Sequence, residues 1–201
     1  MKKGDVNLVF LPATEPGDKT YGTIPERIAG YPTVVARRVQ YPTMVWYNES
    51  IRTQAIGQIR LWNDPSVVLV GFSKSGLGAW NIARAIPDRV SATIIFDAPV
   101  ATDRRPQWRA DEFYADDAAW QKDLPIRTTS EFASAMPETH RLILISGANF
   151  HDEMRMLSQE LLQIGYKHAF LDRSHMKHHW NSGWIEEGLN ELLPPTVPRG
   201  S

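Results

Sequence analysis

The chain has no cysteine, no long apolar run and no excess of charge of either sign. The absence of cysteine excludes disulfides, thiolate metal sites and cysteine nucleophiles, and it leaves the redox compartment open. No apolar run approaches the length that a membrane-spanning helix needs. Lys and Arg together number 22 against 23 for Asp and Glu, so the net charge of -1 gives no electrostatic signature of binding to nucleic acid or to an anionic membrane.

The length of 201 residues is enough for one sizeable core, and we expect a single domain over residues 1–195. The N-terminal stretch MKKGDVNLVFLPA begins with two lysines, but Asp5 and Asn7 interrupt it and its apolar run is too short for a signal peptide. We therefore expect a cytoplasmic location, with secretion left open. Residues 196–201 end in VPRGS, which resembles a protease-site or cloning remnant, and we treat them as a tail.

Short apolar runs alternate with segments of helical period along the chain. Strands that are apolar on both faces are typical of a parallel sheet covered by helices on both sides. The sequence therefore predicts an α/β fold with a mostly parallel sheet. The expected strands are residues 6–11, 33–41, 66–70, 92–100, 141–147 and 168–172, and the expected helices are residues 24–30, 50–62, 77–86, 154–164 and 184–193.

Residues 101–140 interrupt this alternation. The segment is rich in charged and aromatic residues and shows no clean period. We interpret it as a small insertion that lies over one edge of the sheet. We expect its aromatic side chains to form a local hydrophobic core and not to contact a substrate.

One stretch carries chemical information: VVLVGFSKSGLGAW, Val67 to Trp80, in which an apolar strand runs through a Gly/Ser cluster into a helix. A phosphate-binding loop would need Lys and Ser or Thr where Leu77 and Gly78 stand. A dinucleotide-binding fingerprint fits poorly as well, because it belongs to the first strand of its unit and needs a ribose-binding acid about twenty residues on. A nucleophile elbow, or a Gly/Ser turn without chemistry, remains.

A nucleophile elbow needs small residues two positions before and after a serine, because larger side chains would clash at so sharp a strand-to-helix corner. GFSKS supplies Gly71, Ser73 and Ser75 in that arrangement. Here the sequence resembles the α/β-hydrolase family, whose elbow is G-x-S-x-G, with Ser75 in place of the last glycine. The resemblance extends over nearly the whole chain, without the extra N-terminal strands of larger members, and it implies a sheet of about six strands.

The resemblance also implies that an acid and then a histidine follow the nucleophile Ser73 along the chain. In the family the acid usually follows the strand expected at residues 141–147. Asp152 is the nearest acid there, and we favour it. Asp97, at the end of the preceding expected strand, is a competitor, because some hydrolases carry the acid there; its alternative role is to cap a turn.

The base would lie on the loop between the last strand and the last helix, which Asn181 or Ser182 can cap. Three histidines fall on that loop: His175, His178 and His179. The stretch HHWNSGW resembles hydrolases that end in His-x-Trp before the last helix. That frame selects His178 as the base, and the other two histidines stay open.

The oxyanion hole implied by the resemblance takes one donor from the backbone N–H of Lys74, at the start of the helix after the elbow. The second donor would come from the loop LPATEPGD after the first strand. This loop bears a faint likeness to the oxyanion loop of cutinases. The likeness implies that Ala13 of this chain takes the donor position. The alternative for this stretch is an ordinary Pro/Gly turn.

These residues predict a serine hydrolase that cleaves carboxylic esters through an acyl-enzyme, with a small-molecule ester as its partner and no cofactor. A thioesterase or a carbohydrate deacetylase would use the same triad, and a catalytically inactive hydrolase fold could serve as a binding protein. A metallohydrolase is a further alternative, because imidazole and carboxylate suit zinc, but the spacing H-M-K-H-H matches no usual zinc signature and we expect no metal. Its candidate ligands would be His151, Asp152, Glu153, His175, His178 and His179.

Overall fold

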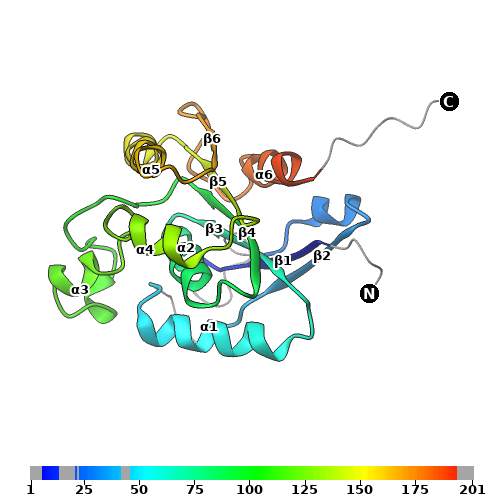
Figure 1. The fold of residues 1–201 in the computed structure, drawn as a ribbon, viewed down its shortest axis with the longest axis horizontal. Coiled ribbons are helices and arrows are strands. Elements are labelled where there is room, and N and C mark those ends of the chain that lie inside the picture. The colour runs from blue at the N-terminus through cyan, green and yellow to red at the C-terminus, as the bar shows by residue number, and fades with distance from the viewer. Residues whose placement is uncertain (1–5, 14–20, 22, 42–45, 194–201) are drawn as a thin grey trace.

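A computed structural model describes residues 6–13, 21, 23–41 and 46–193. Its centre is a six-stranded sheet in the order β2-β1-β3-β4-β5-β6, and all neighbouring strands pair in parallel (Figure 1). The α/β architecture expected from the sequence is confirmed. The strands are β1 (Val6–Phe10), β2 (Val34–Arg38), β3 (Val67–Phe72), β4 (Val90–Phe96), β5 (Arg141–Ile145) and β6 (Ala169–Leu171).

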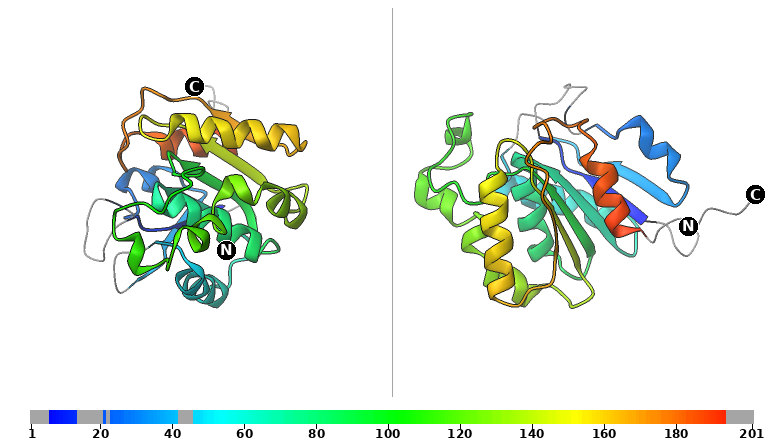
Figure 2. Two further views of the ribbon diagram at one scale, coloured as in Figure 1. Left: turned by 90° about the vertical axis from the view of Figure 1, so that its left-hand side faces the viewer. Right: turned by 90° about the horizontal axis from the view of Figure 1, so that it is seen from above.

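Helices cover both faces of this sheet. One face carries α1 (Glu49–Leu61), α2 (Lys74–Ala85) and α5 (His151–Gln163), whose apolar residues share a core cluster. The other face carries α6 (Trp184–Leu192) and a short 3-10 helix, Glu26–Gly30. The right-hand view of Figure 2 shows α5 and α6 on opposite sides of the strands.

The strand sequence explains why both faces are covered. Successive side chains of a strand point to opposite faces of the sheet. In β1, Leu8 and Phe10 belong to the core on the α6 side, whereas Val9 belongs to the core on the α2 side, and all three are fully buried. An uninterrupted apolar run is therefore what a central strand of this fold needs.

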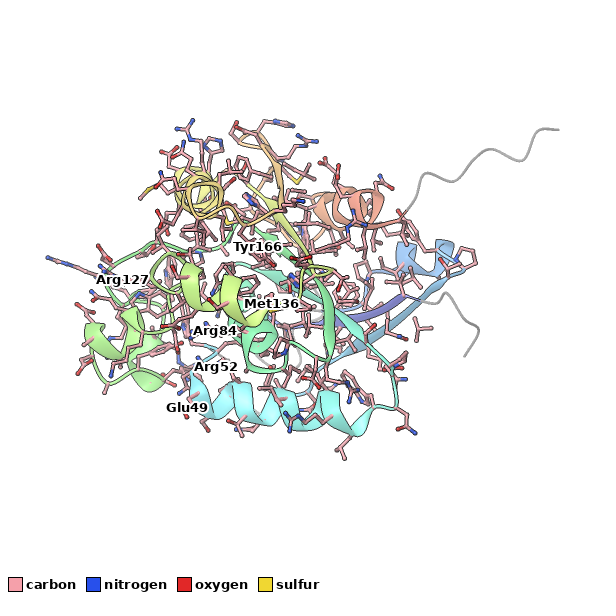
Figure 3. The ribbon with its side chains drawn as sticks, viewed as in Figure 1. Glu49, Arg52, Arg84, Arg127, Met136 and Tyr166 are labelled. Atoms are coloured by element: carbon pink, nitrogen blue, oxygen red, sulfur yellow. The ribbon has the colours of Figure 1, made fainter. Side chains whose placement is uncertain are left out.

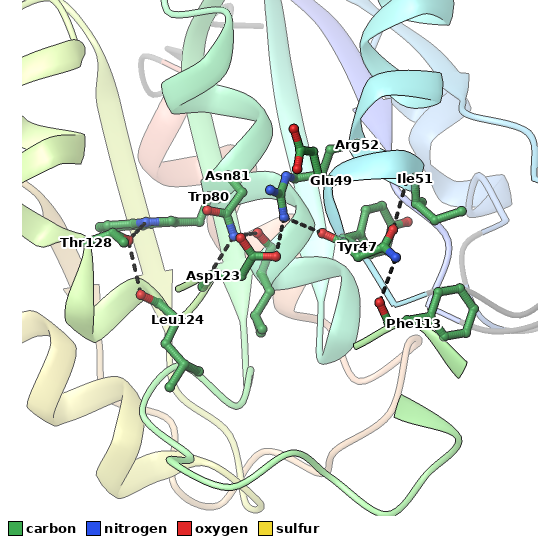
Figure 4. A network of polar contacts seen from close by, with 12 residues as sticks. Tyr47, Glu49, Ile51, Arg52, Trp80, Asn81, Phe113, Asp123, Leu124 and Thr128 are labelled. Carbon is green, nitrogen blue, oxygen red and sulfur yellow. Dashed lines mark hydrogen bonds and ion pairs between the residues drawn. The ribbon is translucent and has the colours of Figure 1, made fainter. Parts of the chain in front are cut away.

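Residues 101–140, the segment interpreted from the sequence as an insertion over one edge of the sheet, pack on α1 and α2. The indole N–H of Trp80 in α2 donates to the Thr128 hydroxyl, and the Trp80 ring stacks on Phe132 at a centroid distance of 3.8 Å. Arg52 of α1 forms an ion pair with Asp123 (Figure 4). The segment contains α3 (Asp117–Gln121), α4 (Thr129–Ala135) and two 3-10 helices, Ala110–Glu112 and Pro125–Arg127.

Several boundaries differ from the sequence expectation. Helix α2 begins at Lys74, directly after the corner, and not at Leu77. Gly76 and Gly78 weaken the helical pattern of the sequence there, but the helix contains them because a Cβ at either position would clash with a neighbouring segment. Strand β4 ends at Phe96, so Asp97 lies beyond it. Helix α6 is entered through Gly183 at a φ of 101°, and its first N–H groups receive no side-chain cap. The expected tail, residues 196–201, lies outside the described residues, in which no helix is long and apolar enough to cross a membrane.

The buried side chain of His140 lies at the amino end of the strands, opposite the end that carries the corner, and it contacts two hydroxyl groups. The two ring nitrogens of His140 lie 3.0 Å from the Thr93 hydroxyl and 2.9 Å from the Tyr166 hydroxyl. Burial lowers the pKa of His140 from 6.5 to about 4 and raises that of Tyr166 to about 12. Tyr166 and Met136, which Figure 3 labels, line a hollow beside His140.

The lowered pKa of His140 predicts a loss of stability in mild acid. The unfolded chain binds a proton at this histidine below pH 6.5, and the folded chain binds it only near pH 4, so the free energy of unfolding falls as pH drops through this window. The slope from this group is at most about 1.4 kcal/mol per pH unit. Urea denaturation between pH 7.5 and pH 4.5 should show a shallower decline for His140→Gln than for the wild type. His175→Gln, at an exposed histidine, should leave the decline unchanged; an equal effect of both variants would contradict the assignment.

Candidate active site

Ser73 lies at the corner between β3 and α2 in a strained backbone conformation. Its φ is 52° and its ψ is -122°, a region that a residue other than glycine seldom occupies. The Ser73 N–H donates to the carbonyl of Phe96 at 3.0 Å, which fixes the corner to the end of the neighbouring strand β4. Because parallel strands end at the same edge, this bond brings Ser73 level with Asp97, the residue after Phe96.

The residues that flank Ser73 are small for reasons that the structure makes specific. A Cβ at Gly71 would lie 2.4 Å from the backbone oxygen of Ser75, so no side chain fits there. The Ser75 hydroxyl accepts from the Phe72 N–H at 2.8 Å and donates to the Phe72 carbonyl at 2.9 Å. Ser75 is therefore more than a tolerated replacement for glycine, since its hydroxyl satisfies both the N–H and the carbonyl of the buried residue Phe72 at the corner.

Asp97 is a buried carboxylate on which three donors converge. It has no exposed surface, and its φ of 42° is again in the left-handed region. The N–H groups of Asn149 and Phe150 donate to its two oxygens at 3.1 and 2.7 Å. The third partner is His178, whose Nδ1 lies 2.6 Å from Asp97 Oδ2. A buried carboxylate needs such partners, because its unpaired burial would cost several kcal/mol.

His178 is held against the corner from the loop after β6. Its ring packs on Phe72, the residue before Ser73, at a centroid distance of 4.5 Å, and on Phe150 at 5.6 Å. The loop is anchored on either side of the histidine. Met176 and Trp180 are buried in the core on the α6 side, and the Met176 carbonyl accepts from the Ala148 N–H at 2.9 Å.

Asp152, the acid favoured from the sequence, lies elsewhere. It is in the first turn of α5 with its side chain 83% exposed, and its partners are His151 and Arg155. The structure brings Asp97 to His178 in its place. The reason is the position of the two strand ends: the loop after β5 contributes the backbone N–H groups of Asn149 and Phe150, while the carboxylate comes from the loop after β4.

The other histidines of the loop do not contact Asp97. His175 is exposed, and His179 Nδ1 accepts from the Asn181 N–H at 3.2 Å while its ring meets the edge of Tyr21. Ser182, the second expected helix cap, donates its hydroxyl to the His179 carbonyl instead. The three histidines considered as alternatives therefore occupy distinct environments, and His178 alone among them is paired with a buried acid.

The residues considered as metal ligands are also separated. His151 bridges the side chains of Asp152 and Asp172, whereas Glu153 accepts from the Ala101 N–H at 2.7 Å and from the Thr102 hydroxyl at 2.6 Å. The hydrogen bond from His151 lowers the pKa of the exposed Asp172 carboxyl. Within the described part of the chain, no three His, Asp or Glu side chains are placed to hold a metal ion.

The two expected oxyanion donors follow the carboxyl ends of adjacent strands, β3 for Lys74 and β1 for Ala13. Lys74 is the first residue of α2, and its buried ammonium lies 5.5 Å from the centre of the Trp46 ring. Ala13 is buried in the loop after β1, the strand adjacent to β3. Residues 14–18, the part of LPATEPGD that follows Ala13, lie outside the described residues.

Several contributors were not found from the sequence. They act through backbone groups or through lack of a side chain: the N–H groups of Asn149 and Phe150, and Gly147, where a Cβ would lie 2.4 Å from Asp97 Cγ. Residue type does not indicate which backbone amide faces a carboxylate. The only available signal was the glycine at the end of the strand RLILISG.

Gly147→Ala is expected to lower the free energy of unfolding by about 1–3 kcal/mol, because the added methyl must displace the buried Asp97 carboxylate. Gly57→Ala is the matched control. Nothing lies within 4 Å of a Cβ at Gly57, which is inside α1, so that change should be neutral or stabilise by about 0.5–1 kcal/mol. Urea denaturation of both variants tests the packing around Asp97. Equal stability of the two would contradict it.

No protein-family profile and no curated protein sequence matches the chain. Solved structures are similar to it. Dipeptidyl peptidase 4 of Porphyromonas gingivalis has a TM-score of 0.63 and 12% identity over 88% of this chain, which spans 28% of that protein. MPT51 (FbpC1) of Mycobacterium tuberculosis has a TM-score of 0.60 and 15% identity, covering 94% of this chain and 88% of its own. MGS-MChE2, an alpha/beta hydrolase enzyme from a metagenome of lagoon sediments at Mar Chica, Morocco, has a TM-score of 0.54 and 12% identity, covering 94% and 90%. The likeness establishes the fold: this chain has the α/β-hydrolase fold.

Proposed function

We propose that this protein is a serine hydrolase that cleaves carboxylic esters, with Ser73 as nucleophile, His178 as base and Asp97 as the acid in place of Asp152. The observation that carries the proposal is the 2.6 Å contact between His178 and the buried Asp97, next to a serine held at a φ of 52°. Strained backbone at a strand-to-helix corner is the arrangement that presents a serine hydroxyl clear of its own chain.

The orientation of His178 supports the role of base. With Nδ1–H donating to Asp97, the other ring nitrogen, Nε2, carries the lone pair. In the proposed reaction Nε2 takes the proton of the Ser73 hydroxyl while Ser73 Oγ forms a bond to the ester carbonyl carbon. The Asp97 carboxylate stabilises the imidazolium that results. Collapse of the tetrahedral intermediate breaks the bond to the alcohol oxygen, which receives the proton from Nε2.

The second half of the reaction repeats these steps with water. His178 Nε2 takes a proton from water, the hydroxide oxygen adds to the acyl carbon, and the bond to Ser73 Oγ breaks as the proton returns to Ser73. The negative charge that develops on the carbonyl oxygen in both halves needs donors. We assign this role to the backbone N–H groups of Lys74, at the positive end of α2, and of Ala13.

Esters are favoured over amides as substrates because an alkoxide is a better leaving group than an amide anion, so the departing group needs less stabilisation. A thioester or an acetylated sugar would be cleaved by the same steps. The solved structures of similar fold include a protein described as an alpha/beta hydrolase enzyme and a peptidase, which supports acyl transfer as the class of reaction. A binding protein without activity would retain the fold and would not react at Ser73.

Labelling with a fluorophosphonate probe tests the nucleophile. The wild-type chain should react at Ser73 and should hydrolyse p-nitrophenyl acetate, whereas Ser73→Ala should lose both reactions and keep its far-UV circular dichroism spectrum and melting temperature. His178→Ala should cause a loss of hydrolysis on the same scale, because members of a triad act as a unit. His175→Ala and His179→Ala are the matched controls, with modest effects expected. Near-wild-type turnover in Ser73→Ala would falsify the assignment.

Substitution of the two acids separates their roles. Asp97→Asn should lower kcat roughly 10³–10⁴-fold, because the amide no longer stabilises the imidazolium or selects the correct tautomer. Asp152→Asn should change kcat less than about threefold, since its carboxylate is exposed and bound to His151 and Arg155. Steady-state kinetics on p-nitrophenyl acetate measure both. The opposite ranking would return the role of acid to Asp152.

A further inference from the structure

We propose that Tyr47 is a positioning residue for the oxyanion hole: its hydroxyl holds the peptide between Pro12 and Ala13 so that the Ala13 N–H faces the substrate carbonyl at Ser73. The proposal rests on the proposed function, because it assigns a role to the oxyanion hole of that same site. It concerns a residue that does not itself touch the substrate.

The central contact joins Tyr47 to the peptide that carries the expected donor. The Tyr47 hydroxyl donates to the Pro12 carbonyl at 2.6 Å, in a buried environment. That carbonyl and the Ala13 N–H belong to one peptide group, which is planar and trans. In a trans peptide the C=O and N–H bonds point in opposite directions. A hydrogen bond that fixes the carbonyl toward Tyr47 therefore directs the Ala13 N–H away from Tyr47.

The strand register favours a position of this N–H near the corner. Phe10 of β1 pairs with Val70 of β3, and the Leu11 N–H donates to the Val70 carbonyl at 3.0 Å. The same register, extended by three residues past this last pair, would set Ala13 opposite Ser73. The Ala13 side chain packs in the same core cluster as Phe72, on the α6 side of the sheet, whereas Tyr47 lies in the cluster on the α2 side. The Pro12–Ala13 peptide thus lies between Tyr47 on the α2 side and the core cluster on the α6 side.

The Ala13 N–H is available as a donor. Although Ala13 is buried, no acceptor for its N–H is found among the residues that the structure describes. Buried backbone N–H groups almost always have a partner. A substrate oxyanion would supply the missing acceptor.

Tyr47 is built into the fold as a fixed donor. Its ring is fully buried and lies against Gly78 of α2, where a Cβ would be 2.3 Å from the ring. Burial also raises the pKa of Tyr47 well above its usual value, so the hydroxyl keeps its proton. A hydrogen bond to the carbonyl polarises the peptide and strengthens its N–H as a donor.

The backbone around Tyr47 is held in the same way. Figure 4 shows the Arg52 guanidinium between the Tyr47 carbonyl, at 2.8 Å, and Asp123 of the insertion. The next residue, Asn48, caps α1 by accepting from the Ile51 N–H at 3.0 Å. These bonds leave the Tyr47 ring little freedom, which a residue that orients a catalytic peptide requires.

The test compares two internal tyrosine hydroxyls. Tyr47→Phe keeps the ring against Gly78 and removes the hydroxyl that donates to Pro12. Tyr166→Phe, the matched control, removes the bond to His140 at the opposite end of the strands. For each variant, kcat and KM on p-nitrophenyl acetate, the inhibition constant of phenylboronic acid and the melting temperature are measured. Titration with a fluorophosphonate gives the fraction of reactive sites.

Tyr47→Phe should lower kcat about tenfold with KM within about twofold, less than the loss of a whole oxyanion donor. Phenylboronic acid, which forms a tetrahedral adduct with the serine, should bind about tenfold more weakly. Tyr166→Phe should change neither kcat nor the inhibition constant of phenylboronic acid, even where its melting temperature falls as much as that of Tyr47→Phe. Equal kinetics for the two variants, or a change in KM alone for Tyr47→Phe, would overturn the positioning role. A wild-type chain that neither hydrolyses the ester nor reacts at Ser73 would overturn the proposed function itself.

Discussion

A carboxylate removed from water must be surrounded by hydrogen-bond donors, and the carboxyl edge of this sheet is arranged around that of Asp97. Its three donors come from two loops that are distant in sequence: the turn before α5 and the loop after β6. Gly147 provides the space for it. The position of His178, and with it the chemistry that we propose for Ser73, depends on this one buried charge.

Backbone strain is concentrated at the same edge. Among the described residues, three that are not glycine have a positive φ, and two of them are Ser73 and Asp97. Each such residue costs of order 1–3 kcal/mol, which the rest of the fold must offset. The offset is visible nearby: the Ser73 N–H, the Ser75 hydroxyl and the Asp97 N–H all bond to ends of neighbouring strands or to the corner itself. Two of the three residues in this conformation therefore lie at this edge of the sheet, and the third, Arg109, lies in the insertion.

The insertion has a supporting role in this arrangement. Asp123 pairs with Arg52, which donates to the Tyr47 carbonyl (Figure 4). The Tyr47 hydroxyl in turn donates to the Pro12 carbonyl. Asn81 of α2 donates to the Asp123 carbonyl at 2.8 Å, so the insertion is also tied to the helix that starts at the corner. A segment without clean periodicity in the sequence therefore stabilises the most regular part of the fold.

The sequence by itself determined the parallel α/β architecture, the six strands and the corner at Ser73, because these follow from local patterns: apolar runs, helical periods and small residues at fixed spacing. It also pointed to His178 through a short motif. It did not determine which acid faces that histidine. Asp97 and Asp152 both follow expected strands, and only the packed sheet decides that the carboxylate comes from β4 and the backbone donors from the loop after β5. Pairing of a buried charge depends on contacts 52 to 81 residues apart in the chain, and no local pattern encodes contacts of that range.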